Sequence, residues 1–159
     1  MRNRVFLALV LCLTLVTTGF AQNKKAAKVN LEEQIKLNGK VRTGKLDNGL
    51  TYFIRSNNKP ANRAEFQIAV NAGSVLEEAN EVGLAHFTEH MNFNGTKQFP
   101  ANTMIDELEK EGIVFGREIN AYTGFDQTVY MVTLPTDNKE LFDMGLKILD
   151  GWAFGALMT

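Results

Sequence analysis

Cysteine is almost absent from this chain of 159 residues, which contains a single one, Cys12. A disulfide framework and a zinc site built from cysteines are therefore excluded. The chain also lacks any block of lysine and arginine of the kind that marks a nucleic-acid surface, so we expect no nucleic-acid partner. Histidine is scarce too, with two residues in the whole chain.

Long apolar segments are also missing. The one apolar run, from Val5 to about Val16, is short for a membrane span, which needs about 20 residues. It follows a basic start and closes on the small-x-small pattern "GFA", which predicts a signal peptide over residues 1–21. Without it, 138 residues remain with 15 basic and 18 acidic side chains, hence a net charge of −3 and no stable membrane span. We expect an exported protein, periplasmic or secreted, that stays membrane-anchored if the segment is not cleaved.

The next part of the chain is expected to contain three strands. Residues 22–40 are polar and only weakly periodic, which is typical of a leader segment. Segment 41–55 predicts two strands around Asp47-Asn48-Gly49, because Asn-Gly tolerates positive φ at low cost. Segment 64–73 alternates apolar and polar residues, as a half-buried strand does. We expect the acidic loop that follows, with Glu77, Glu78 and Glu81, to be solvated.

Helices and two more strands are expected in the rest of the chain. One helix is predicted over 83–93, and another over 102–111 with Asn102 or Thr103 as its cap and Gly112 at its end. "REINAYTGF" and "QTVYMVTLP" predict two strands. Asp137 can cap a last helix, whose apolar stripe consists of Leu141, Met144, Ile148, Leu149 and Trp152. This order of elements indicates an α+β fold with a largely antiparallel sheet and helices packed on it.

Both histidines of the chain lie in "HFTEH", residues 86–90. Helical residues advance by about 100°, so His86 and His90 share one face, and Glu89 also points that way. Imidazoles at this spacing converge on one tetrahedral metal ion, and zinc is the usual occupant of such sites. A carboxylate beside zinc can act as the general base for a water that attacks a carbonyl. The pattern therefore predicts amide hydrolysis with Glu89 as the base.

A simpler interpretation of "HFTEH" stays open at this point. The two histidines can be ordinary polar residues on a half-exposed helix, because a match of five residues is only moderately specific. On either interpretation, Leu84, Phe87 and Met91 are expected to form the face of the helix that is buried in the core.

The residues around this pattern carry a more specific likeness. "HFTEHMNFNGT" resembles the signature of the pitrilysin and insulin-degrading-enzyme family, the inverzincins, whose H-x-x-E-H reverses the H-E-x-x-H of other zinc peptidases. "LDNGLTYFI" is similar to the first strand pair of that family, and "FPAN", "LEKEG" and "INAYTGFDQTVYMVTLP" follow in the family's order. The resemblance covers about residues 41–155 and is greatest to the bacterial exported zinc proteases of the family.

The resemblance implies a role for particular residues. It assigns His86 and His90 as ligands of one Zn²⁺ ion and Glu89 as the general base. It implies that Asn120 and Ala121 lie on an edge strand along which a peptide or an unfolded protein segment binds. Asn120 has a simpler alternative, as a strand-end residue that bonds to its own backbone.

The chain also departs from a complete member of that family. The third ligand of the family is a glutamate on a later helix, and no glutamate follows Glu140 here. We therefore expect residues 41–159 to be an incomplete N-terminal zinc-peptidase domain, with the third ligand and a homologous C-terminal domain beyond Thr159. Such a fragment is expected to bind zinc weakly and to be inactive. The alternative to a zinc metalloendopeptidase is a non-catalytic scaffold or binding subunit with the same fold.

Overall fold

The computed structural model describes residues 30–158. The predicted signal peptide and the first part of the leader, residues 22–29, lie outside the described residues. Residues 30–40 are exposed and contain turns but no helix or strand. Within residues 30–158, no helix has the length and apolar character that crossing a bilayer requires. The contacts divide the described part of the chain into two compact units, with the boundary between residues 55 and 56.

The described part of the first unit ends in a β-hairpin. Strands β1 (Val41–Lys45) and β2 (Thr51–Arg55) pair antiparallel, with Val41 opposite Arg55. Gly49 has a φ of 91°, and the backbone N–H of Leu50 donates to the side-chain oxygen of Asn48 at 3.1 Å. The Asn-Gly turn predicted from the sequence is therefore confirmed, because glycine reaches this left-handed φ without steric cost.

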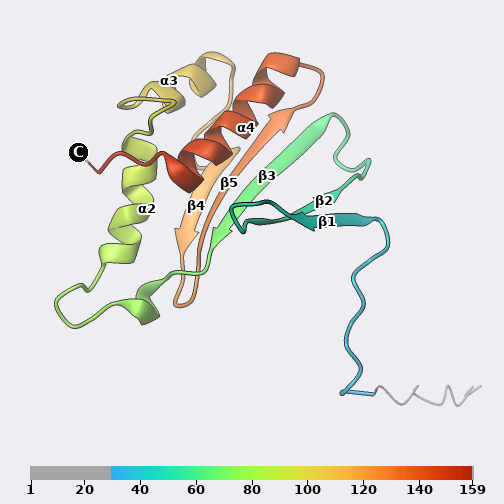
Figure 1. The fold of residues 1–159 in the computed structure, drawn as a ribbon. Coiled ribbons are helices and arrows are strands. Elements are labelled where there is room, and N and C mark those ends of the chain that lie inside the picture. Colours follow the sequence, from blue (N-terminus) through green and yellow to red (C-terminus); the bar gives the residue numbers. More distant parts are fainter. Residues whose placement is uncertain (1–29, 159) are drawn as a thin grey trace, which may run out of the picture. The chain divides into compact units, whose positions relative to one another are not determined.

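The second unit contains an antiparallel sheet of three strands (Figure 1). Strand β5 (Thr128–Pro135) lies between β3 (Arg63–Val70) and β4 (Ile119–Thr123). The register places Phe66 opposite Val132 and Val132 opposite Ile119, and all three side chains are buried. Alternate residues of a strand point to opposite faces, so the apolar residues of the three strands line one face together.

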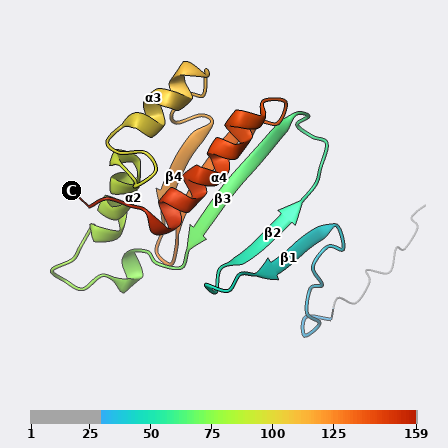
Figure 2. The ribbon, with the colours of Figure 1, turned by 45° about the horizontal axis from the view of Figure 1, so that its top comes forward.

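Helices cover that face of the sheet. Helix α4 (Lys139–Phe154) contacts β3 and β5, and helix α2 (Leu84–Asn94) contacts β4 (Figure 2). Helix α3 (Thr103–Lys110) and the short helix η2 (Ser74–Leu76) complete the described elements. The predicted α+β fold with an antiparallel sheet is confirmed.

The core of the second unit forms between the sheet and these helices. The predicted stripe of α4 faces it: Leu141, Ile148 and Trp152 are buried, and Met144 and Leu149 are partly buried. Ile148 and Trp152 form one buried cluster with Phe66, Phe99, Met104, Leu108, Ile113, Ile119, Tyr130, Val132 and Leu134. The burial of these apolar side chains fixes how α4 packs on the sheet. Helix α2 and strand β4 belong to the same unit.

The caps of α3 and α4 differ from the prediction. The N-cap of α4 is Asn138, whose side-chain oxygen accepts hydrogen bonds from the N–H groups of Glu140 and Leu141, so the prediction of Asp137 was one residue early. Asn102 is the N-cap of α3, but no side chain caps that helix, since the Thr103 hydroxyl donates to the Pro100 carbonyl instead. Gly112 does end α3 in the left-handed region, with a φ of 76°.

Candidate metal centre

The helix that carries "HFTEH" begins at a carboxylate. The two oxygens of Glu77 accept hydrogen bonds of 2.8 Å from the backbone N–H groups of Gly83 and Ala85. The first N–H groups of a helix have no partner within it, and the helix dipole favours a negative charge there. The two bonds hold the pKa of Glu77 below its ordinary value of 4.5. Glu77 is therefore a cap of α2 and not simply a solvated loop residue as expected.

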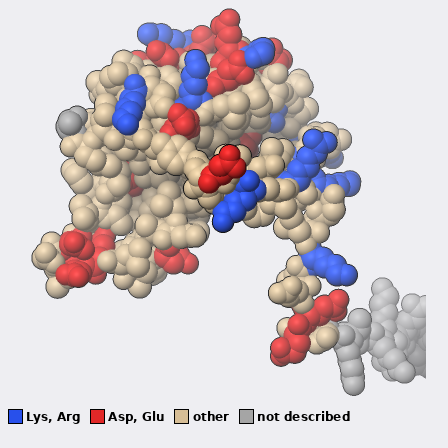
Figure 3. Space-filling view, viewed as in Figure 1, with Lys and Arg blue, Asp and Glu red and all other residues tan. Residues whose placement is uncertain are grey.

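Glu77 belongs to a loop that is tied to the sheet. The N–H of Ser74 donates to the Gly124 carbonyl at 3.1 Å, and the N–H of Val75 donates to the Phe125 carbonyl at 2.8 Å. Gly124 and Phe125 form the turn between β4 and β5. Figure 3 shows acidic side chains gathered at the loop before α2. The start of α2 is thus held to the end of β4 through Glu77 and this loop.

The two histidines converge at the exposed side of α2. Their Nε2 atoms lie 3.2 Å apart, their ring centroids lie 4.7 Å apart, and both side chains are exposed. Two imidazole nitrogens on one tetrahedral zinc ion, each at about 2.0–2.1 Å from it, would be about 3.3 Å apart. The observed separation of the two nitrogens fits a shared metal ion, so the residues present suit zinc.

Glu89 lies on the inner side of the same helix. Its side chain is 8% exposed, and its Oε2 accepts a hydrogen bond of 2.6 Å from the hydroxyl of Thr123 on β4. A buried carboxylate needs such a donor, because loss of hydration without replacement costs several kcal/mol. Glu89 lies one residue before His90 and about one helical turn after His86. This position is compatible with the prediction that Glu89 lies beside the two histidines.

The buried face of α2 differs from the prediction. Leu84 is 51% exposed and Phe87 is 60% exposed, while Glu89 and Asn92 are the buried residues of the helix. Met91 is half-buried. The prediction that Leu84 and Phe87 face the core was wrong, because α2 turns polar side chains toward polar partners on the sheet.

Asn92 and Tyr130 form the second of these polar contacts. The Asn92 amide donates a hydrogen bond of 2.7 Å to the hydroxyl oxygen of Tyr130 on β5. Burial raises the pKa of Tyr130 above its ordinary value of 10.0, the bond from Asn92 lowers it, and the charge of Glu89 raises it. Tyr130 is thus neutral at physiological pH and is available to bond with α2.

Strand β4 has an open edge beside this helix. No strand of the described residues pairs with its outer side, since the sheet order is β3-β5-β4. The Thr133 N–H donates to the Glu118 carbonyl, and the Gly124 N–H donates to the Gln127 carbonyl. Hydrogen-bonded pairs alternate along antiparallel strands, so the backbone groups of Ala121 and Thr123 point away from β5.

Asn120 and Ala121 occupy this edge differently. The Asn120 side chain is exposed, and its oxygen accepts a hydrogen bond of 2.9 Å from the outward N–H of Ala121. Ala121 packs against the core. The bond that Asn120 accepts is the local backbone contact that the alternative interpretation expected, and it also covers an edge N–H that could otherwise pair with a foreign strand.

An apolar groove borders His90. It has a volume of about 600 Å³ and is lined by His90, Met91, Phe93, Asn94, Asn102, Ile105 and Phe115. Phe93 packs edge-to-face on Phe115, with ring centroids 5.3 Å apart. The groove places apolar surface next to the face of α2 that carries the two histidines.

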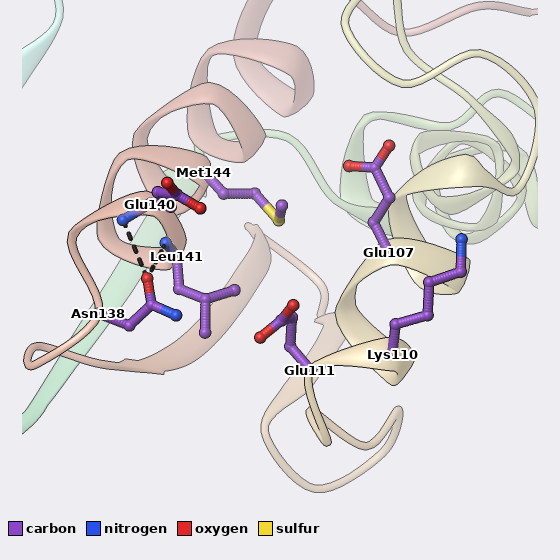
Figure 4. A pocket seen from close by; sticks show the side chains of 7 residues that line it. All are labelled: Glu107, Lys110, Glu111, Asn138, Glu140, Leu141 and Met144. Atoms are coloured by element: carbon purple, nitrogen blue, oxygen red, sulfur yellow. Dashed lines mark hydrogen bonds between the residues drawn. The ribbon is translucent and has the colours of Figure 1, made fainter.

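A second hollow lies between α3 and the start of α4 (Figure 4). Its volume is about 170 Å³, and its lining includes Glu107, Lys110, Glu111 and Glu140. Glu140, the last glutamate of the chain, therefore lines this hollow and none of the residues of "HFTEH" does. Among residues 30–158, no group of three or more histidine, cysteine or acidic side chains could hold a metal ion.

Sequence reasoning missed two residues of this centre, Glu77 and Thr123. Glu77 precedes the first capped N–H by six residues, which is outside the three-residue spacing of a capping box. Thr123 is separated from Glu89 by 34 residues. Its place in "INAYT", at the end of an expected edge strand, was the one available indication.

Comparison with known proteins places the chain among peptidases. A probable zinc protease, PqqL, from Escherichia coli (strain K12) is 41% identical over 156 residues, which are 98% of this chain and 16% of that protein. A zinc protease PQQL-like protein from Arabidopsis thaliana is 42% identical over 106 residues, which are 67% of this chain and 11% of that protein. The chain thus spans only a small part of the length of these curated relatives.

Solved structures agree with these relatives. The first half of the periplasmic protease PqqL from Escherichia coli superposes with a TM-score of 0.75 and 42% identity, over 79% of this chain and 27% of that one. The ferredoxin protease FusC, solved in complex with Arabidopsis ferredoxin, superposes with a TM-score of 0.66 and 32% identity, over 75% of this chain and 13% of that one. Residues 52–159 match the insulinase family, peptidase family M16. Together with the match of fold and sequence, this shows that the chain belongs to the insulinase family of zinc peptidases, peptidase family M16.

Proposed function

We propose that this chain provides part of the active site of a zinc metalloendopeptidase, in which His86 and His90 bind one Zn²⁺ ion and Glu89 is the general base. The observation that carries the proposal is the convergence of the two histidine Nε2 atoms at 3.2 Å, with the Glu89 carboxylate on the same helix. Membership in a family of zinc peptidases supports the choice of metal and reaction.

The zinc ion and Glu89 would have separate roles in the hydrolysis of a peptide bond. Zinc, when bound, would polarise the substrate carbonyl and lower the pKa of a coordinated water toward about 7. Glu89 would accept the proton of the attacking water and return it to the leaving amine. No side chain of this chain needs to act as a nucleophile. Because Glu89 is 8% exposed and bonded to Thr123, its carboxylate is held in place before substrate binds.

The substrate would be a peptide or an unfolded protein segment in extended form. Its backbone would pair with the open edge of β4 at Ala121 and Thr123, and the Asn120 side chain would release the Ala121 N–H to the peptide. Main-chain bonds of this kind give affinity with little dependence on sequence. FusC, a related protease, was solved in complex with ferredoxin, which supports a protein-derived substrate.

Further parts of the site would come from outside this chain. The chain spans 16% of the length of the Escherichia coli relative. We assign the third ligand to a glutamate beyond Thr159, and we expect a homologous C-terminal domain to follow. The 159 residues alone would then bind zinc weakly and lack peptidase activity. Residues 1–21 would act as a signal peptide for export, and a periplasmic location is supported by the periplasmic relative PqqL.

The test is Glu89→Gln in the full-length protein. The variant should keep one zinc ion and lose about 10²–10⁴-fold in kcat on a fluorogenic peptide library, because general base catalysis supplies roughly that factor. Glu107→Gln makes the same change on α3 and should leave the zinc content and the kcat unaltered.

Two outcomes would contradict the proposal. Turnover retained by Glu89→Gln would remove the base assignment. A wild-type protein that binds stoichiometric zinc but cleaves no peptide of the library would instead favour the scaffold or binding subunit.

A further inference from the structure

We propose that Thr123 is a positioning residue, whose hydroxyl fixes the Glu89 carboxylate relative to a peptide bound at the edge of β4. The inference rests on the proposed function and deepens it, since it names the group that aligns the base with the substrate. Thr123 itself does not touch the reacting atoms through its side chain.

The first observation is the bond between the two side chains. The Thr123 hydroxyl lies 2.6 Å from Glu89 Oε2, which is a short distance for a hydroxyl bonded to a carboxylate. In this bond the Thr123 hydroxyl is the donor and the carboxylate oxygen of Glu89 is the acceptor. The second carboxylate oxygen of Glu89 has no hydrogen bond within the described residues, which leaves it available to a water. One carboxylate oxygen of Glu89 is therefore held by Thr123, and the other can accept the proton of a water.

The second observation is that a neighbouring hydroxyl leaves Thr123 free to donate to Glu89. Thr128 stands opposite Thr123 in the β4–β5 ladder, and its hydroxyl lies 3.4 Å from that of Thr123. The Thr128 hydroxyl also lies 2.9 Å from the Ala72 carbonyl, which can only accept. In both contacts the Thr128 hydroxyl is the donor, so Thr123 only accepts in its contact with Thr128. The proton of Thr123 is therefore directed to Glu89, 2.6 Å away.

The third observation concerns the backbone of the same residue. The N–H and carbonyl of Thr123 point to the open edge of β4, as the ladder of hydrogen bonds requires. Its side chain points to the face that α2 covers. One residue thus offers its main chain to a peptide strand and its hydroxyl to the base. Displacement of the base by about 1 Å can cost about 10²-fold in rate, so a fixed link between these two groups matters for catalysis.

The decisive comparison uses Thr123→Val and Thr123→Ser in the full-length protein. Valine keeps the shape of threonine and removes the hydroxyl, whereas serine keeps the hydroxyl. Thr123→Val should lower kcat by about 10- to 100-fold, with KM within about twofold of wild type and the zinc content unchanged. Thr123→Ser should restore most of the kcat. Thr133→Val makes the same change on β5, on the opposite face of the sheet, and should keep the wild-type kcat.

A measurement without turnover tests the same bond. Thermal unfolding of the zinc-free protein is compared for Thr123→Val, Glu89→Ala and the double variant. The fall in Tm caused by Thr123→Val should shrink or vanish once residue 89 is alanine, because the effects of removing the two partners of one hydrogen bond are not additive. If valine itself prevents folding, Thr123→Ala takes its place in both measurements, since it removes the hydroxyl without adding a methyl group to the packed site.

The two proposals fail in different ways. An inactive wild type, or an active Glu89→Gln, overturns the proposed function and with it the role of Thr123 in catalysis. The role of Thr123 alone is overturned if Thr123→Val keeps the wild-type kcat while the wild type is active and Glu89→Gln is inactive. That role is also overturned if serine does not restore kcat, if KM or zinc content changes with kcat, or if the losses in Tm are additive.

Discussion

Glu77 and Gly83 are joined by a hydrogen bond of 2.8 Å between a carboxylate oxygen and the backbone N–H at the start of α2. The second oxygen of Glu77 binds the N–H of Ala85, the residue before His86. The Ala85 N–H that Glu77 caps is therefore adjacent in sequence to His86, the first of the two proposed zinc ligands. A change at Glu77 should affect the stability of the end of α2 that carries His86.

The effect of replacing Glu77 on stability should depend on pH in a specific way. The folded protein holds the pKa of Glu77 below 4.5, so the native state favours the ionised form. The stabilisation is fully present above the unfolded pKa and is lost as the pH falls through the folded one. Glu77→Gln should lower Tm at pH 7, and the difference from wild type should shrink below about pH 4.5. Thermal scans from about pH 3 to pH 7 measure this, with Glu78→Gln as the neighbouring control.

A pH-independent difference between Glu77→Gln and wild type would contradict this account. An equal effect of Glu78→Gln would contradict it as well, since the carboxylate that binds the first turn of α2 is that of Glu77.

Removal of either histidine should abolish zinc binding without loss of the fold. His86 and His90 are exposed and lie outside the buried core cluster, so neither should stabilise the apo protein. In the full-length protein, His86→Ala or His90→Ala should reduce zinc from about one ion per chain to near zero, because a zinc site needs at least three protein ligands. Metal analysis and the Tm of the zinc-free form measure the two effects. A variant that keeps one equivalent of zinc would show that the metal is bound elsewhere.

The cap of α4 offers a test between neighbouring residues. Asn138 accepts from two backbone N–H groups at 3.0 and 3.2 Å, and Asp137 does not cap the helix. Asn138→Ala should cost about 1 kcal/mol in the free energy of unfolding, the typical effect of a lost cap. Asp137→Ala should change it by less than about 0.5 kcal/mol, as at most exposed sites. Denaturant unfolding of both variants decides the matter, and a larger effect at Asp137 would contradict the structure.

Gly145 should resist replacement by alanine even though alanine favours helices. A Cβ at this position of α4 would lie 2.7 Å from the Phe66 ring and 2.9 Å from Leu134 Cδ1, and both side chains are buried. Crowding of a packed core costs about 1–3 kcal/mol, which exceeds the gain of up to about 1 kcal/mol in helix propensity. Gly145→Ala should therefore lower stability in denaturant unfolding. Lys147→Ala, on the exposed side of the same helix, should have little effect, and a stabilising Gly145→Ala would refute the packing.

Sequence patterns predicted the elements well because the patterns are local. The Asn-Gly turn, the alternation of β3 and the stripe of α4 each depend on residues within a few positions of one another. The face of α2 that is buried was not predictable in this way. Leu84 and Phe87 are apolar but exposed, since the polar pair Glu89 and Asn92 finds partners on distant strands.

The sequence by itself determined the spacing of His86, Glu89 and His90, because a helix turns by about 100° per residue wherever it lies. Only the tertiary structure decided what surrounds that triplet. The contacts of Glu89 with Thr123 and of Asn92 with Tyr130 join residues 34 and 38 positions apart. They depend on how the sheet closes against α2, which is a matter of long-range packing and not of local periodicity.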